Sequence, residues 1–290
     1  MSYFHLNLIL KGKLTVCCLL MLPAIPLNAQ REAKQIGDFK ESISLNEHLR
    51  GTKRTLQYRP DGDEFVCVNG KNRYTRALYG SHSPFRVETS DRPVFAFYNN
   101  GRGGNISFKV ILRDGTELAL DCTGHCESRY SAGKRTYYLT DPSWGKGELR
   151  ISVLALADMD GAIWRFSPSN MPKGAILRWQ HGGATGKRLS RNGDMGVDPA
   201  DCFELPAEAA DLVTGELPLQ KEVYLVRGEV PEDYNVRKLY QQAEAASLAL
   251  ASHLKIETPD PYSNTLGGAL VAAADGIWDG QVWLHGAIGW

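Results

Sequence analysis

The sequence has no excess charge of either sign and no cluster of basic residues. Its 290 residues include 33 Lys and Arg and 33 Asp and Glu, which gives a net charge of zero. Nucleic-acid-binding proteins usually carry a basic patch or stripe on one face. We therefore exclude nucleic acid as a partner of this chain.

Long apolar runs are also scarce. The run near the N-terminus, residues 14–22, is too short to cross about 30 Å of hydrocarbon as a helix, so we expect no membrane span. Lysines precede this run and prolines follow it. Ala29 then provides the small residue expected at a cleavage site. This order predicts a cleavable secretory signal peptide over residues 1–29. Such a leader predicts export from the cytoplasm.

Cysteine is too rare to build a disulfide framework in a chain of this length. Two of the six cysteines lie inside the apolar run of the leader, and not at the cleavage site where a lipid anchor would need one. Cys122 and Cys126 flank His125 like half of a zinc site, but no second Cys/His pair follows at matching spacing. We expect no metal and no cofactor, and interpret the thiols as buried or loosely paired, with a Cys122–Cys126 disulfide as the alternative. The cysteines of the mature chain are Cys67, Cys122, Cys126 and Cys202.

Several catalytic and nucleotide-binding signatures are missing. Neither the Gly-x-Ser-x-Gly motif of serine hydrolases nor the His-Glu-x-x-His motif of zinc proteases is present. Residues 181–187 resemble a phosphate-binding loop, but the first glycine is absent and Arg188 replaces the Ser or Thr that would bind Mg²⁺. We interpret this segment as a structural loop.

Residues 191–199 are dense in Asp, Asn and Gly. Their oxygens could bind calcium, but the spacing of an EF-hand is absent. A turn-rich connection is the favoured interpretation, and a contribution to the rim of an active site is the alternative. The candidate residues of this loop are Arg191, Asn192, Asp194 and Asp198.

From residue 55 to residue 230 the sequence alternates short runs of β-forming residues with Gly, Asp and Asn. Asn69-Gly70 and Asp114-Gly115 are hairpin-turn signals, and residues 99–104 read as a glycine-rich loop. Many short strands without helical periodicity predict antiparallel sheets. We expect a mainly β fold, an antiparallel β-sandwich over residues 55–230, after a flexible lead-in at residues 30–54. The expected strands are 65–68, 93–98, 106–112, 117–121, 135–139, 148–157, 162–166, 175–180 and 222–227.

The pattern becomes helical after Pro231. Apolar residues recur at steps of three and four from Val236 to Leu254, which predicts an amphipathic helix with Asp233 or Asn235 as its N-cap. The prolines at 259 and 261 would end it, and a second helical stretch would follow over residues 264–278. We assign residues 231–290 to a linker helix and the start of a larger helical array.

Long motifs in the chain resemble a known family. They cover residues 65–80, 85–88, 182–188, 191–199, 262–270, 275–278 and 284–287. These motifs are similar to the N-terminal part of the secreted Bacteroidetes family with domain of unknown function 4450. The resemblance implies a β-sandwich followed by an (α/α)₆ toroid, as in six-hairpin glycoside hydrolases that act on complex polysaccharide. On this interpretation the chain ends within the first helical hairpin, without most of the catalytic toroid.

Function is harder to assign to particular residues. Glycoside hydrolysis uses two carboxylates that flank the scissile bond, and the sequence identifies no such pair, so we name no catalytic residue. We expect the non-catalytic portion of a carbohydrate-active enzyme, with a carbohydrate-binding or scaffold module as the alternative. Asp275 and Trp278 have i, i+3 spacing and can share a helix face, although helical tryptophans are more often core residues. The candidate substrate-binding residues are Asn264, Asp275, Trp278, Trp283 and His285.

Overall fold

The fold is described by a computed structural model that covers residues 57–71, 76–80, 85–99, 102–182, 212–231, 233–278 and 280–283. All of these residues belong to one compact unit, Gln57–Trp290. The expected signal peptide, the lead-in, Cys202 and the 191–199 loop lie outside the described residues. Within the described part of the chain, no helix has the length and apolar character needed to cross a membrane.

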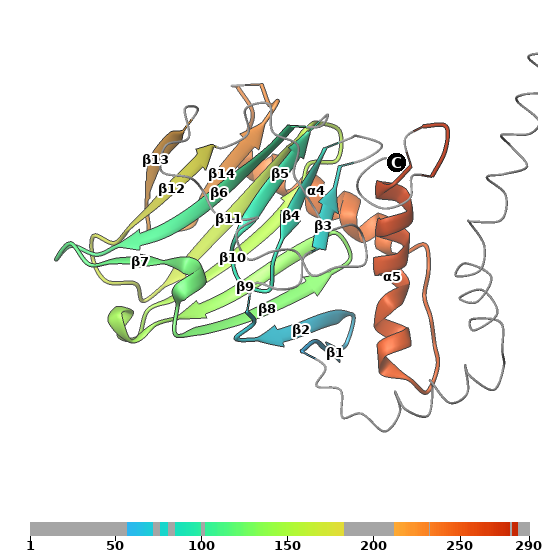
Figure 1. The fold of residues 1–290 in the computed structure, drawn as a ribbon, viewed down its shortest axis with the longest axis horizontal. Helices are drawn as coiled ribbons and strands as arrows, with labels where there is room; N and C mark the ends of the chain where they lie inside the picture. The colour runs from blue at the N-terminus through green and yellow to red at the C-terminus, as the bar shows by residue number, and fades with distance from the viewer. Residues whose placement is uncertain are drawn as a thin grey trace, which may run out of the picture. The chain divides into compact units, whose positions relative to one another are not determined.

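Two antiparallel sheets form the body of the unit (Figure 1). The strands of the first sheet are, in spatial order, β1 (Arg59–Asp61), β2 (Glu64–Val68), β8 (His125–Ser131), β9 (Lys134–Thr140), β10 (Glu148–Ala155), β11 (Gly161–Ser169) and β14 (Val223–Gly228). The strands of the second sheet are β13 (Val213–Pro218), β12 (Ile176–Gly182), β6 (Arg102–Ile111), β5 (Phe95–Asn99), β4 (Arg86–Thr89) and β3 (Arg76–Tyr79), with β7 (Glu117–Ala119) paired to β6. Short 3₁₀ helices span Leu120–Cys122 and Pro142–Trp144.

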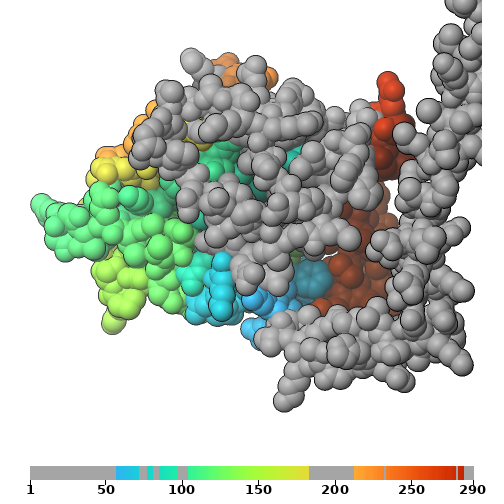
Figure 2. Space-filling model, in the orientation of Figure 1, coloured from blue at the N-terminus to red at the C-terminus, as the bar shows by residue number. Residues whose placement is uncertain are grey.

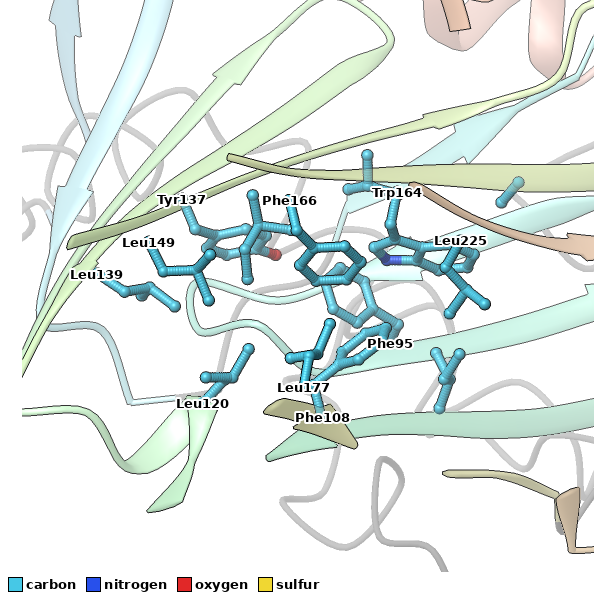
Figure 3. Packing of buried hydrophobic residues seen from close by; sticks show 14 of the residues in the cluster. Phe95, Phe108, Leu120, Tyr137, Leu139, Leu149, Trp164, Phe166, Leu177 and Leu225 are labelled. Carbon is cyan, nitrogen blue, oxygen red and sulfur yellow. The ribbon is translucent and has the colours of Figure 1, made fainter. Parts of the chain in front are cut away.

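The core lies between the two sheets. Successive strand residues point to opposite faces, so alternate residues of β10 such as Leu149, Ile151 and Val153 are buried there. Aromatic rings fill the centre: Phe95 of the second sheet lies 5.6 Å from Trp164 of the first, edge to face (Figure 3). This burial from both sheets makes the architecture a β-sandwich, as the sequence predicts.

One hairpin prediction is confirmed and one is wrong. Asp114-Gly115 connects β6 to β7. Asn69-Gly70 forms no hairpin, because Asn69 extends the pairing of β2 with β8: its backbone N–H donates to the Cys126 carbonyl at 2.8 Å, and its side-chain Oδ1 accepts from the Cys126 N–H at 2.9 Å. The next strand, β3, belongs to the other sheet. Gly70 is needed for close packing, since a Cβ there would lie 2.4 Å from the Asp91 carboxyl carbon.

Some strand boundaries also differ from the prediction. The glycines expected in a loop at 99–104 lie in β6, where Gly103 and Gly104 pair with Tyr98 and Phe97 of β5. A glycine weakens a strand but does not end it when the neighbouring strand supplies the hydrogen bonds. The predicted strand at 117–121 ends at Ala119, where the 3₁₀ turn begins. The sequence did not indicate β1, β3, β4, β8 or β13.

A charged side chain is fully buried inside the sandwich. Arg135 of β9 is 0 % exposed and lies between the rings of Tyr58 and Tyr130, at 5.5 and 5.6 Å from their centroids. Its Nε donates to the Thr89 hydroxyl at 3.3 Å, and Nη1 donates to the Ser128 hydroxyl at 3.1 Å. Cation–π contacts and hydrogen bonds of this kind offset the desolvation of the guanidinium. The cluster also links the two sheets, because Thr89 belongs to β4.

The first helix, α4 (Val236–Ala251), packs on the outer face of the first sheet. It begins at Asn235, whose side-chain oxygen accepts from the Lys238 N–H at 3.0 Å. Leu239 and Tyr240 are buried against Leu154 of β10 and the neighbouring strands. The predicted amphipathic helix and its asparagine cap are confirmed.

The second helix, α5 (Pro261–Gly276), stands beside β1 and β3 (Figure 1). The sequence analysis used Pro261 as a stop signal, but Pro261 is the first residue of α5. Proline is favoured at this position because its missing N–H has no partner in a first turn. Asp260 before it is the N-cap.

Close contacts fix both helices to the turns of the sandwich. The Ser247 hydroxyl of α4 donates to the carbonyl of Ala132, in the turn between β8 and β9, at 2.6 Å. The Thr265 hydroxyl of α5 donates to the carbonyl of Gly62, in the turn between β1 and β2, at 2.9 Å. In the space-filling view, red atoms of α5 lie against blue atoms of these first strands (Figure 2). The helices and the sandwich therefore share one packed junction.

The Asp260 cap makes the stability of α5 depend on pH. Hydrogen bonds from the Ser263 hydroxyl at 2.8 Å and the Tyr262 N–H at 3.1 Å hold the pKa of Asp260 below its ordinary value. A carboxylate whose pKa is lowered by folding stabilises the fold above its ordinary pKa, and this stabilisation is lost as the pH falls through the lowered value. We expect wild type to exceed Asp260→Asn in stability at neutral pH, and the difference to shrink below the ordinary pKa of 3.8.

Urea unfolding of both proteins across a pH series measures this difference. Asparagine retains one capping oxygen and loses the other, which accepts from Ser263. The loss of this acceptor does not vary with pH, so the pH-dependent part of the difference reports the charge of Asp260. A difference that stays constant down to the acid limit would show that Asp260 titrates normally.

Candidate functional site

An aromatic pair lies just beyond the end of α5. Trp278 and Trp283 form a β-bridge, and their ring centroids lie 4.6 Å apart at an angle of 51°. The intervening Gly280 has a φ of 99°, a left-handed conformation that glycine adopts without strain. Trp278 is half-buried, whereas Trp283 is 67 % exposed. The chain thus presents one indole to solvent and supports it with a second.

Asp275 lies close by in the sequence but faces a different space. It lines a cavity of about 120 Å³ whose walls are mostly alanines of α4, α5 and the strands, together with Tyr79 and Ser247. Trp278 is not part of that lining. The sequence predicts a helix through Trp278, whereas α5 ends at Gly276 and the chain continues as a turn in which the Trp278 N–H donates to the Asp275 carbonyl at 3.1 Å. Among the described residues that line this cavity, Asp275 is the single acid.

Asn264 lies at the opposite end of α5 and holds the connection between the helices. Its Oδ1 accepts from the Thr258 N–H at 2.7 Å, and its Nδ2 donates to the Thr258 carbonyl at 2.9 Å. At 1.5 Å per residue, Asn264 and Asp275 are about 16 Å apart along the helix axis. The structure therefore does not bring these two candidates together.

Other candidates are not placed by the structure. His285 lies outside the described residues, and so do the loop residues Arg191, Asn192, Asp194 and Asp198. The segment 183–188, which resembles part of a phosphate loop, also lies outside them. Their roles remain predictions from the sequence.

The cysteines of the described chain are free thiols. Cys67 and Cys126 are buried, Cys122 is exposed, and the alternative Cys122–Cys126 disulfide is absent. Burial raises the pKa of Cys126 to about 12, so this thiol stays protonated at neutral pH. Within the described ranges, no group of three or more His, Cys, Asp or Glu side chains is arranged to hold a metal ion.

The sequence analysis missed a larger cavity at the junction of the helices with the sandwich. Its volume is about 360 Å³, and Asn264 borders it. Charged residues also line it: Asp63, Lys134, Glu244 and Lys255. They come from three regions far apart in the chain, the β1–β2 turn, β9, and α4 with the connection after it, and no motif in the sequence links them.

One family model matches part of the chain. The model described as "Domain of unknown function (DUF4450)" matches residues 100–230, which run from β6 to β14. This is the family that the sequence motifs resemble, and the match extends neither over β1 to β5 nor over the two helices. No curated protein matches the chain.

Proposed function

Residues 100–230 of this chain match the DUF4450 family model, and from that premise we propose that the chain is the polysaccharide-binding portion of a secreted carbohydrate-active protein. The N-terminal lysines, apolar run and small residues support export. The proposed place of action is the periplasm or the cell surface, where complex glycans are accessible.

The exposed Trp283 carries the proposal. Tryptophan is enriched at surfaces that contact a partner, because its large ring is apolar and its N–H can form a hydrogen bond. A pyranose ring has an apolar C–H face that matches the flat face of an indole. Trp278 holds Trp283 at 4.6 Å through the β-bridge, so little conformational freedom is lost on binding.

Binding without catalysis is favoured over hydrolysis by the surroundings of Asp275. Hydrolysis of a glycosidic bond uses two carboxyl groups about 5 to 9.5 Å apart. Within the described lining of its cavity, Asp275 has no second acid beside it. We therefore assign to Asp275 no catalytic role in this chain.

In this proposal the two helices are the first pair of an (α/α)₆ toroid. The composition of α5 supports it, because Pro261–Ala274 contains no charged residue and Leu270 is 50 % exposed. A helix that is apolar on several faces normally packs against further helices.

Replacing Trp283 with alanine tests the binding proposal. Wild type should be retarded in native gels that contain at least one soluble plant or host polysaccharide. The Trp283→Ala variant should bind at least about tenfold more weakly, the factor that 1.4 kcal/mol represents, because the stacking surface is gone.

Tyr138→Ala is the matched control, since Tyr138 is also exposed (39 %) but lies on the outer face of β9. It should migrate as wild type does. Equal retardation of wild type and Trp283→Ala would remove the aromatic pair from the binding site. Unretarded wild type on every polysaccharide would contradict the proposed function.

A further inference from the structure

We propose that the cavity of about 360 Å³ at the helix–sandwich junction binds a single neutral sugar unit. The choice of a sugar rests on the proposed function. The cavity is distinct from the Trp278–Trp283 pair, because neither tryptophan lines it.

The position and size of the cavity suit a small ligand. It lies between α4, the connection that follows it, α5, and the β1–β2 and β8–β9 turns. Pockets for small molecules commonly lie at such junctions and have volumes of about 300–1,000 Å³. The hydrogen bonds from Ser247 to Ala132 and from Thr265 to Gly62 fix the walls in place.

Small and aliphatic residues form the apolar part of the cavity. Gly268 brings α5 so close that a Cβ there would lie 3.1 Å from Ala132 and 3.2 Å from Ala251. Leu248 and Leu254 contribute side chains that are 60 and 41 % exposed. Together these residues offer an apolar surface to the C–H face of a pyranose.

The charged residues of the cavity balance one another. Lys134 Nζ lies 3.0 Å from Glu244 Oε1, Asp63 adds a negative charge, and Lys255 adds a positive charge that also pairs with Glu257 at 2.6 Å. A ligand with a net charge would meet a like charge as well as an opposite one, so neither sign gains a net attraction. The balance therefore favours a neutral ligand over an anion or a cation.

The hydroxyl groups of the cavity favour a ligand that is rich in hydrogen-bond donors. Ser247, Ser252 and Thr265 already donate their protons to backbone carbonyls, at 2.6, 2.7 and 2.9 Å. A serine or threonine hydroxyl has one proton and two lone pairs, so these oxygens can only accept from a ligand. The carboxylates of Asp63 and Glu244 are also acceptors. A neutral molecule that offers several O–H donors beside an apolar face is a sugar.

Isothermal titration calorimetry on the whole chain tests the inference. The probes are methyl glycosides of xylose, glucose and galactose, with galacturonate and galactosamine as charged analogues. We expect one neutral glycoside to bind with a stoichiometry of one, and the charged analogues to bind at least about tenfold more weakly. An oligosaccharide of the same sugar distinguishes a chain end from a free sugar, and binding of either supports the proposal.

Two variants locate the binding. Ser252→Trp places bulk in the cavity from an exposed position, and Asp63→Ala removes an exposed acceptor; each should weaken binding at least about tenfold. Asp158→Ala removes an exposed carboxylate from the β10–β11 turn and should bind as wild type does. If Ser252→Trp and Asp63→Ala both bind the glycoside normally, the site is elsewhere and the inference is wrong.

The calorimetric result and the gel result test the cavity inference and the proposed function separately. Ser252→Trp should keep the gel retardation that depends on Trp283, and Trp283→Ala should keep the calorimetric signal. Retention on polysaccharide without binding of any glycoside would overturn the cavity inference alone. Equal or tighter binding of a charged analogue would also overturn it.

Discussion

Trp164→Ala is expected to lower the free energy of unfolding by about 3–5 kcal/mol, the usual range for removing a buried tryptophan. Trp164 is 0 % exposed. Its ring lies 5.6 Å from Phe95 and 6.1 Å from Phe108, so truncation leaves a large void where the two sheets meet (Figure 3). The rings of Phe95 and Phe108 cannot fill this void completely, because they are held in place by their own packing in the core.

Equilibrium unfolding in urea, followed by circular dichroism, measures the loss. Tyr138→Ala is the comparison, because Tyr138 is an aromatic residue of the same sheet that points outward and is 39 % exposed. The guanidinium groups of Arg129 and Arg150 lie over its ring, at 5.9 and 5.4 Å from the centroid, and the loss of such exposed cation–π contacts costs about 1 kcal/mol. Similar midpoints for the two variants would contradict the placement of Trp164 at the centre of the core.

Gly276→Val is expected to destabilise the junction of α5 with the sandwich by about 1–3 kcal/mol, the cost of overpacking a filled site. A Cβ on Gly276 would lie 2.1 Å from Cγ and 2.6 Å from Cβ of Tyr79. These atoms lie near the Tyr79 backbone, so a rotation of the ring cannot relieve the clash. Either α5 or β3 must move.

The expected result is a lower urea midpoint and faster proteolysis of the connection between α4 and α5. Ala273→Val is the control, since it adds the same β-branched side chain at an exposed position of the same helix. Combining Gly276→Val with Tyr79→Ala should recover part of the loss, because the two residues are in contact. Full additivity of the two substitutions would show that this contact does not hold α5.

The layers of the fold were predictable because they depend on local patterns. Alternation along β10 and the helical spacing that begins at Val236 each reflect burial on one face of one element. The features of the fold that the sequence did not predict depend on contacts between residues that are distant in the chain. Asn69 supports a left-handed turn, but its role is decided by Cys126, which lies on another strand. No local pattern carries that information.

Arg135 shows the same limit in the core. Alternation along β9 places it on the same face as Tyr137 and Leu139, yet a charge at such a position is normally expected to face solvent. Tyr58, from the segment before β1, and Thr89, from the other sheet, make its burial tolerable. These partners are brought together by the topology.

The candidate sites also differ in how far local sequence could reveal them. The sequence could point to Trp278 and Trp283, because two tryptophans only five residues apart can be seen in a short segment, although their ring contact and their exposure cannot. It could not identify the larger cavity, whose charged residues Asp63, Lys134 and Glu244 meet only after the helices pack on the sandwich. The expectation that Asp275 and Trp278 share a face depended on a helix that ends two residues before Trp278.

The bond from Thr265 to Gly62 has a consequence for biogenesis. It joins residues 203 positions apart, and it places α5 beside β1, the edge strand of its sheet. A ribosome completes every strand of the sandwich before it makes α5, and contacts that close such long loops form late. Throughout that interval the nascent chain carries a sheet edge with unpaired backbone groups, the kind of surface to which another strand can add. A chaperone bound at this edge would protect the nascent protein until α5 has been synthesised.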